Sequence, residues 1–437
     1  MATTNVLANS SKYNLYKYKV NIRFIRNDAA LPEDEFQLSK ALTKLVIHKN
    51  FDDFIYPYYK AVFQLSVEQV KFLTVNHHAG KIYISIEKFL IKIEKDATTE
   101  TPTGEFYIKD IPFAVFEIDK NPTDAIEPEV PSKRSESNAG QKAIPFTLGL
   151  IPSVPMDINK YINNGAFHDT ALPNVLAYLV GVNSPKFPNY KFFVSNIDNV
   201  KVYETIIVPP FNFNKAVVYV DSCYGLYKTK LLQFFDCNEA YVMSANRLFK
   251  NEKYKYQLVA LEMMGPEALA SLTDASYKSD EDSVWFLRTR QKPILENSNK
   301  LMREIGGESV KFVGSSQEEN TAVDCGPVKI DKDETNSERS KEIVVKKMYD
   351  NDFIMSKYNG NLQENSAKFT AVWDDCDIET FQSYFEYTVL SNSSYSKDYE
   401  GYWRLTCVEH TFNKVMNVDE LAIVYSVGMF RPAVKAE

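Results

Sequence analysis

The chain has 437 residues, of which 44% are hydrophobic and 13% aromatic, with 28 Phe and 27 Tyr but only 15 Gly. This length and hydrophobicity allow a sizeable core, which excludes intrinsic disorder for most of the chain, and leave room for about two to four domains. The 58 acidic and 50 basic residues give a net charge of −8, which argues against tight nucleic-acid binding as the main role, because such proteins need a basic surface.

The cysteines are dispersed and form no CxxC pair: Cys223, Cys237, Cys325, Cys376 and Cys407. An odd, scattered set indicates reduced thiols in a protein made in the cytoplasm, and not a disulfide framework. No apolar run approaches the roughly 18 residues of a membrane helix, and the first residues lack a signal-peptide pattern. We therefore expect a soluble protein without a membrane partner.

Residues 1–118 are predicted to form an N-terminal β-barrel. Apolar and polar side chains alternate over residues 16–24 and again over 63–67, as in strands with one buried face. In residues 81–94 the apolar positions change from even to odd near Glu87–Lys88, which predicts a β-bulge or a sharp bend. Small barrels use long bent antiparallel strands of this kind to turn corners.

Residues 119–142 contain three prolines and no aromatic residue, which predicts an exposed linker. Residues 143–250 are expected to form a mixed α/β domain that contributes strands to a second barrel. A helix is predicted over 172–180, with Gly181 as its C-terminal cap. Strands are predicted at 200–209, where Pro209-Pro210 would end the strand, at 216–220, and at 231–235 and 241–243 on either side of a turn at 236–239.

Residues 251–341 are predicted to be a mixed region of helix and loop, with helical character over 266–272 and a polar connector at 331–341. Residues 342–437 are expected to form a C-terminal β-barrel. Its predicted strands lie at 368–373, 402–410 and 421–426, whereas residues 377–390 fit either an Asp-capped helix or a β-hairpin.

The sequence predicts no catalytic, cofactor-binding or metal-binding residue and no cofactor. His77-His78 lacks a Cys, Asp or Glu at metal-ligand spacing, and fits a turn before Gly80. His168-Asp169 is expected in a loop, and His410 is expected to pack or cap at the end of a strand. Phosphate-binding and nucleophile-elbow motifs are absent.

Two other groups of residues are candidates for a nucleophilic or a cation-binding site. The cysteines lie mostly among apolar residues, and none stands at a strand-to-helix start where a thiolate is usually activated. Trp373, Asp374, Asp375 and Asp377 form a small acidic cluster, for which a solvated turn is favoured over a cation site.

Three stretches together resemble the baseplate hub protein of contractile-tailed bacteriophages, which is related to the base of the type VI secretion spike. The first stretch is the opening region, with the strand at 17–26, the phrase ALTKLVIHKNFDDFIYP at 41–57 and the bent strand that ends near Glu94. The second spans 200–247, with ETIIVPP, YVDSCYGLY and QFFD; in such hubs a short helix follows the proline-ended strand. The third is GYWRLTCVEHTF at 401–412.

The resemblance implies an α+β, mainly β fold with two tail-tube-like antiparallel β-barrel domains around a mixed α/β middle. It implies a homotrimeric structural virion protein that joins a hexameric tail tube to a trimeric central spike, with six barrels per trimer. Its further partners would be baseplate wedge proteins and the tape measure protein. DNA would pass through its channel during ejection without specific binding.

The expected location is the tail baseplate of the virion, after assembly in the host cytoplasm. Two alternatives stay open. One is an off-axis baseplate or tail-fibre-attachment protein. The other, less favoured, is a tail-associated cell-wall hydrolase, for which only residues 251–345 leave room; that segment contains Cys325 but no histidine.

Overall fold

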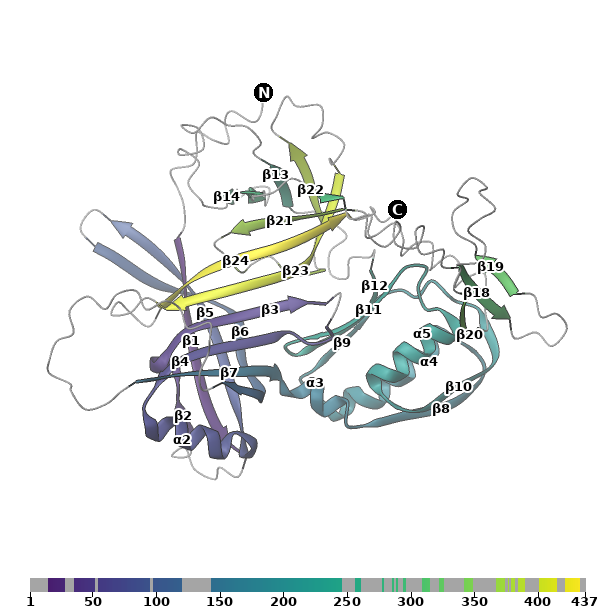
Figure 1. Ribbon diagram of the computed structural model, residues 1–437, viewed down its shortest axis with the longest axis horizontal. Helices are drawn as coiled ribbons and strands as arrows, with labels where there is room; N and C mark the ends of the chain where they lie inside the picture. The colour runs from purple at the N-terminus through teal and green to yellow at the C-terminus, as the bar shows by residue number, and fades with distance from the viewer. Residues whose placement is uncertain are drawn as a thin grey trace.

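A β-barrel and an α/β lobe beside it make up most of the part of the chain that the computed structural model describes (Figure 1). The described residues are 15–27, 35–51, 54–94, 97–119 and 143–245, with shorter segments between 256 and 432. The fold is mainly β with few helices, as predicted. None of the described helices is long and apolar enough to cross a membrane.

Eight described strands close the barrel, and they come from both ends of the chain. They are β1 (Leu15–Arg26), β3 (Leu42–Asn50), β4 (Tyr58–Leu65), β5 (Gly80–Glu94), β6 (Ala97–Asp119), β7 (Ile144–Pro152), β23 (Gly401–Lys414) and β24 (Leu421–Pro432). Around the ring the order is β23-β3-β4-β7-β6-β5-β1-β24, and the pairing of β23 with β24 closes it. All of these pairs are antiparallel.

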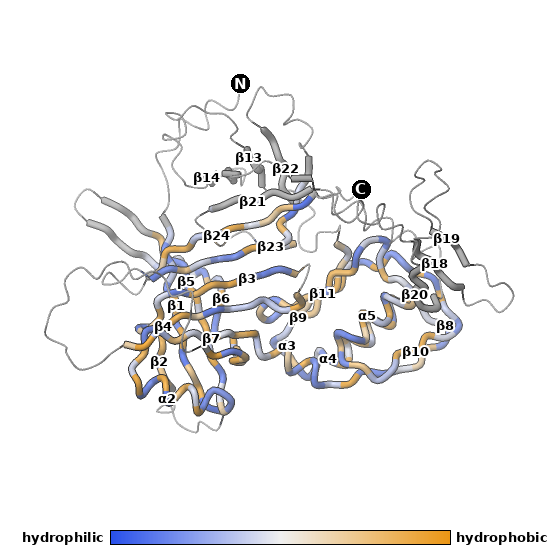
Figure 2. The backbone as a smooth tube through the Cα atoms, viewed as in Figure 1, coloured by the Kyte–Doolittle hydropathy of each residue, from blue (hydrophilic) through white to orange (hydrophobic). Residues whose placement is uncertain are grey.

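The alternating side chains fill the barrel interior. Tyr18, Ile22 and Phe24 of β1 are fully buried, while their odd-numbered neighbours are partly exposed. The register of β5 against β6 shifts three times between Ile84 and Phe89, which confirms the predicted irregularity. Figure 2 shows hydrophobic and hydrophilic residues alternating along these strands. Burying each large apolar side chain favours folding by about 1.5–3 kcal/mol.

A helix interrupts the barrel where the sequence predicts a continuing strand. β4 ends at Leu65, and α2 (Val67–Asn76) begins after Ser66. The Ser66 hydroxyl accepts a hydrogen bond from the Gln69 backbone N–H, and the Gln69 side chain accepts one from the Ser66 N–H. This capping box outweighs the alternation at Val67.

Three short elements accompany these barrel strands. They are β2 (Glu35–Gln37), which pairs with β1, and the 3-10 turns η2 (Ser39–Ala41) and η3 (His77–Ala79). The turn η3 confirms the interpretation of His77-His78 as a turn before Gly80.

The β23–β24 hairpin extends beyond the barrel and pairs with further strands of the same sheet. Near its turn it pairs with β3 and β1, and at its other end β22 (Tyr384–Val389) and β21 (Ala367–Trp373) continue the sheet on either side. The predicted boundaries at 118 and 342 therefore need correction, because β7 and the C-terminal hairpin complete the N-terminal barrel. Alternation identifies strands locally and contains no information about which distant strand pairs with which.

The α/β lobe packs helices on a two-stranded sheet. Its elements are α3 (Ser153–Ile158), β8 (Ile162–Ala171), α4 (Leu172–Asn183), the 3-10 turn η4 (Ser184–Lys186), β9 (Lys191–Val194), β10 (Val202–Asn212), α5 (Phe213–Tyr224), β11 (Leu231–Asp236) and β12 (Glu239–Ser244). β8 pairs with β10, while β11, β12 and β9 form a separate sheet. The predicted strands at 231–235 and 241–243 and their turn are confirmed.

Two predictions about where elements of the lobe end are wrong. Gly181 lies inside α4, which continues to Asn183, whose buried amide donates to the carbonyl oxygen of Leu179 at 2.7 Å and so supports the last turn. β10 does not stop at Pro209-Pro210 but reaches Asn212. A register shift between Val208 and Phe211 accommodates the two prolines, which have no N–H to donate.

Residues 216–220, predicted as a strand, belong to the helix α5. The Asn212 side chain accepts a hydrogen bond from the Lys215 N–H at 2.9 Å and caps the helix. Ala216, Val217 and Val220 are buried, which matches helical periodicity.

The remaining described strands lie between the lobe and the C-terminal hairpin. They are β13 (Tyr256–Ala260), β14 (Tyr277–Lys278), β15 (Trp285–Phe286), β16 (Arg288–Thr289), β17 (Ile294–Leu295), β18 (Ser309–Gly314), β19 (Ala322–Cys325) and β20 (Glu342–Met348). Residues 384–389 are a strand, which settles part of the ambiguous stretch. The predicted linker beyond Asp119, the helical character at 266–272 and the connector at 331–341 lie outside the described residues.

Candidate functional site

A lysine occupies the inward face of β3 at the end of the barrel nearest the lobe. Lys49 follows Leu45 and Ile47 on the same buried face, and its side chain is only 2% exposed. Because an isolated buried ammonium group is costly, its partners determine whether this arrangement is stable.

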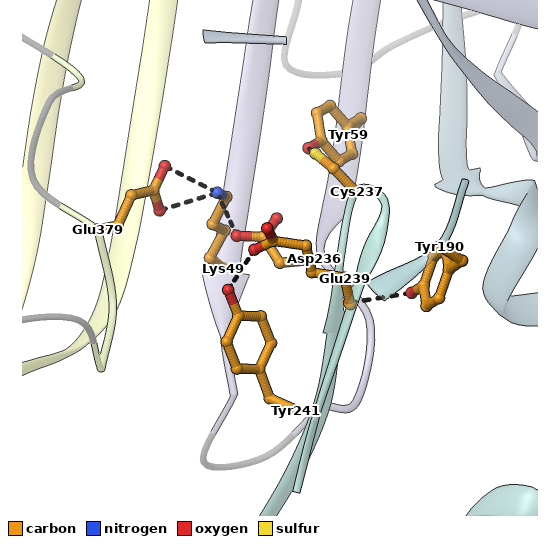
Figure 3. A network of polar contacts seen from close by, with 8 residues as sticks. All are labelled: Lys49, Tyr59, Tyr190, Asp236, Cys237, Glu239, Tyr241 and Glu379. Carbon is orange, nitrogen blue, oxygen red and sulfur yellow. Dashed lines mark hydrogen bonds and ion pairs between the residues drawn. The ribbon is translucent and has the colours of Figure 1, made fainter. Parts of the chain in front are cut away.

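The partners of Lys49 are two carboxylates from distant parts of the chain (Figure 3). Its Nζ lies 2.9 Å from Oδ2 of Asp236, and 3.0 and 2.8 Å from the two carboxyl oxygens of Glu379. Asp236 ends β11 in the lobe, and Glu379 lies between β21 and β22. The ring of Tyr107 on β6 has its centroid 5.2 Å from the ammonium group. One buried cation thus joins the barrel, the lobe and the C-terminal region.

The β11–β12 turn follows Asp236 and packs against the barrel. Cys237 has a positive φ of 50°, which is uncommon for a residue other than glycine. Its Sγ lies 3.5 Å from the hydroxyl of Tyr59 on β4, and the side chain packs on the barrel core. The turn is therefore held in place by contacts with the barrel.

Aromatic packing and backbone hydrogen bonds surround the ion cluster. Phe51 stacks on Phe234 with ring centroids 4.2 Å apart, and Phe381 packs against the same ring at 5.9 Å. The Phe235 N–H donates to the carbonyl of Ile55 at 2.8 Å. We call the six polar residues of this interface, Lys49, Tyr59, Tyr107, Asp236, Cys237 and Glu379, the junction cluster.

Two further tyrosines of the lobe brace the turn around Glu239. The Tyr190 hydroxyl donates to the Glu239 backbone carbonyl at 3.0 Å, and the Tyr241 hydroxyl donates to the Glu239 carboxylate (Figure 3). Burial, together with the neighbouring carboxylates, raises the pKa of both tyrosines. Both hydroxyls are therefore neutral donors at neutral pH.

Burial perturbs the ionisable groups of the junction cluster. It would by itself lower the pKa of Lys49, but Asp236 and Glu379 hold that pKa well above its usual value. Burial raises the pKa of Glu379, with Asp236 adding to the effect and Lys49 opposing it. Burial also raises the pKa of the Cys237 thiol, which stays protonated and is a poor nucleophile.

The other candidate residues from the sequence lie in separate parts of the structure. The Nδ1–H of His77 donates to the carbonyl oxygen of Thr74 at 2.9 Å. His168, predicted in a loop, lies on the exposed face of β8 with its Nδ1 3.3 Å from Oγ1 of Thr205. His410 lies within β23, fully buried, with Nδ1 2.7 Å from Oγ of Ser426. Its packing role is as predicted, although it lies inside the strand and not at its end.

The cysteines and the acidic stretch give no metal site in the part of the chain that is described. Cys223 and Cys376 are buried, whereas Cys237 and Cys407 are half-buried. None of these four cysteines forms a disulfide. No group of three or more His, Cys, Asp or Glu side chains among the described residues is placed to hold a metal ion. Trp373 is fully buried, and the side chains of Asp374, Asp375 and Asp377 lie outside the described residues.

Sequence reasoning did not identify the junction cluster. One signal was present: Lys49 takes an inward position in the alternating series Leu45, Ile47, Lys49, Phe51, where a charge requires a partner. Its partners lie 187 and 330 residues further along the chain, and no local pattern connects them.

Comparison with known proteins gives one family and several solved structures. A family model described as Bacteriophage PBS1 gene 109 protein matches residues 11–425. No curated protein matches the chain. The family match agrees with the resemblance to phage tail proteins that the sequence indicated, which is thereby confirmed.

Three solved structures are among those that match the chain. The tail protein from Neisseria meningitidis MC58 is 8% identical, with 95% of this chain and 96% of that chain covered and a TM-score of 0.47. The prophage MuSo2 43 kDa tail protein from Shewanella oneidensis is 9% identical, with 94% and 98% covered and a TM-score of 0.47. A half-lidded PdpA–VgrG complex from Francisella is 11% identical, with 98% and 60% covered and a TM-score of 0.44.

Proposed function

Because the chain belongs to the family described as Bacteriophage PBS1 gene 109 protein, we propose that this phage tail protein is the trimeric hub of the baseplate. In this role it joins the hexameric tail tube to the trimeric central spike and lines the channel for DNA and the tape measure protein. Baseplate wedge proteins would bind its outer surface, and the virion would be its final location after assembly in the host cytoplasm.

The observation that carries the proposal is the shared β23–β24 hairpin. One end of this hairpin closes the eight-stranded barrel, and the other end pairs with β21 and β22. We propose that the strands paired at that other end form the second tube-like unit of the chain. Three copies would then present six such units to the tube and three-fold symmetry to the spike, and pairing in a ring would protect sheet edges.

The lobe exposes apolar side chains along one of its sheets. On the β8–β10 sheet, Ile162 is 66% exposed, Val202 61% and Ile207 56%, with Ile162 and Val202 at opposite ends of the paired strands. The net charge of −8 suits a channel through which DNA slides without binding.

The test is the solution mass of the purified chain, measured by light scattering after size exclusion at several concentrations. We expect a stable species near three times 50.1 kDa. A stable dimer or hexamer would contradict the trimeric hub and favour a wedge or tube role. If the chain stays monomeric, the same measurement with tube and spike proteins added must give a three-copy complex, or the proposal fails.

We also propose that the protein has no enzymatic activity. The Cys237 thiol is kept protonated by burial, and His410 is fully buried against Ser426. Zymography on peptidoglycan is expected to show no cleared band, and a cleared band that co-purifies with the chain would contradict this.

A further inference from the structure

The junction cluster has an unequal number of opposite charges. Asp236 and Glu379 both contact the one ammonium group of Lys49 at 3.0 Å or less, and their side chains are only 13% and 15% exposed. If both carboxyl groups were ionised, this buried group would have a net charge of −1. Removing such a charge from water without a partner is costly, and proteins usually avoid the cost by neutralising a group.

Among the described residues, Lys49 is the cation in contact with the carboxyl pair, and the buried guanidinium of Arg404 lies over the ring of Phe381 at 5.5 Å. From β4 and β6 come Tyr59 and Tyr107, whose pKa values burial raises, so that both are neutral. From the turn and from β23 come the protonated thiol of Cys237 and His410, whose pKa burial lowers, so that its ring is neutral. Cys376, on the same segment as Glu379, is buried in the barrel core.

We propose that Glu379 retains its proton at neutral pH, and that this proton makes the junction cluster a pH-sensitive latch between the barrel, the lobe and the C-terminal region. With one proton on the pair the cluster is neutral and the three segments stay closed on one another. When the proton is lost, the interior gains one negative charge and the latch loosens. The raised pKa of Glu379, caused first by burial and then by Asp236, supports this assignment.

The direction of the pH effect follows from proton linkage. When the junction opens, Glu379 becomes hydrated and its pKa returns to the ordinary value of about 4, so the open state binds fewer protons than the closed state. Closure is therefore strongest in acid and weakens as the pH rises toward the raised pKa of Glu379 in the closed junction. Between the ordinary pKa and the raised pKa, the equilibrium constant for opening increases about tenfold for each pH unit. This inference depends only on contacts within one chain, and does not require the trimer or the hub role.

The first experiment detects the proton itself. Infrared spectra of the full chain at neutral pH are expected to contain a carbonyl band from a buried protonated carboxyl group. The band should disappear in Glu379→Gln and in Asp236→Asn, since each leaves one carboxylate for one ammonium group. Glu409→Gln is the matched control, because Glu409 is a 49% exposed carboxylate on β23 that pairs with His48 at 3.7 Å, and its substitution should leave the band unchanged.

The second experiment measures opening by modification of Cys237, whose half-buried thiol contacts the Tyr59 hydroxyl at 3.5 Å in the closed junction. The labelling rate is measured by mass spectrometry from pH 5.5 to 8.5, and the wild-type rate is divided by that of Glu379→Gln to cancel the reactivity of the thiol itself. We expect this ratio to rise by up to about tenfold per pH unit. The same ratio for Glu409→Gln against wild type should stay flat.

Two outcomes would overturn the proposal. Absence of a buried carboxyl band in the wild-type chain at neutral pH would show that the pair holds no proton, whether or not the variants fold. A band that is present while the labelling ratio stays flat would show a proton without a latch. Both measurements on wild type remain decisive if the trimer is not found, so failure of the hub role and failure of the latch are distinguishable.

Discussion

Closure of the barrel by strands from both ends of the chain can be tested by a double-mutant cycle. Tyr18 on β1 and Phe412 on β23 are 0% and 1% exposed, and their rings meet edge to face with centroids 5.5 Å apart. If the two ends of the chain formed separate barrels, these residues would not interact. We therefore expect the effects of Tyr18→Leu and Phe412→Leu on the free energy of unfolding to be coupled.

The magnitude follows from the contact. Each leucine substitution keeps most of the buried volume, so we expect each single variant to lose about 1–2 kcal/mol, less than the 3–5 kcal/mol typical of truncating an aromatic residue to alanine. An edge-to-face aromatic pair contributes about 0.5–1.5 kcal/mol beyond its buried area. The double variant should therefore lose less than the sum of the single losses by that amount.

The assay is urea unfolding followed by tryptophan fluorescence, for which the buried Trp373 and Trp403 report on the strands involved. Phe412→Leu combined with Phe213→Leu is the control, because Phe213 belongs to the separate core of the lobe. Those two effects should add within about 0.3–0.5 kcal/mol. A Tyr18–Phe412 coupling no larger than that of the control pair would refute the closed barrel.

Two other predictions concern glycines and a buried histidine. Gly80→Ala would place its Cβ 2.5 Å from both the Ile25 carbonyl oxygen and Cζ of Phe24, so thermal unfolding should show that the free energy of unfolding falls by about 1–3 kcal/mol. Gly181→Ala has nothing within 4 Å of its new Cβ, so the free energy of unfolding should rise by about 0.5–1 kcal/mol. Equal effects of the two substitutions would contradict the packing. Burial holds the pKa of His410 well below its usual value, so the barrel loses stability as the pH falls below about 6.5, where the unfolded chain binds the proton more readily. His410→Gln should reduce that acid dependence in urea titrations at several pH values, and an unchanged pH profile would show that another group causes it.

Local sequence patterns were sufficient wherever neighbouring residues decide the structure. The alternation at 16–24 places Tyr18, Ile22 and Phe24 in the core, and the change of phase in β5 marks its irregular pairing with β6. These features depend on the two-residue period of a strand, which is visible in the sequence itself. The resemblance of three stretches to phage hub proteins likewise indicates the kind of family from local sequence alone.

Competing local signals explain the errors in secondary structure. At 216–220 an apolar run fits a strand as well as a buried helix face, and the cap supplied by Asn212 favours the helix. At Val67 the capping box of Ser66 and Gln69 ends the strand pattern in the same way. In both places side-chain hydrogen bonds at the helix N-terminus decide between two structures that the apolar pattern permits.

The composition and periodicity of this sequence by themselves determined a mainly β protein, the positions of most barrel strands and the faces that they bury. Only the tertiary structure decided that β23 and β24 close the N-terminal barrel, and that Asp236 and Glu379 meet Lys49 in the interior. The physical reason is the range of the interactions. Side-chain periodicity acts between near neighbours in the chain, whereas strand pairing and the compensation of a buried charge join residues that are hundreds of positions apart.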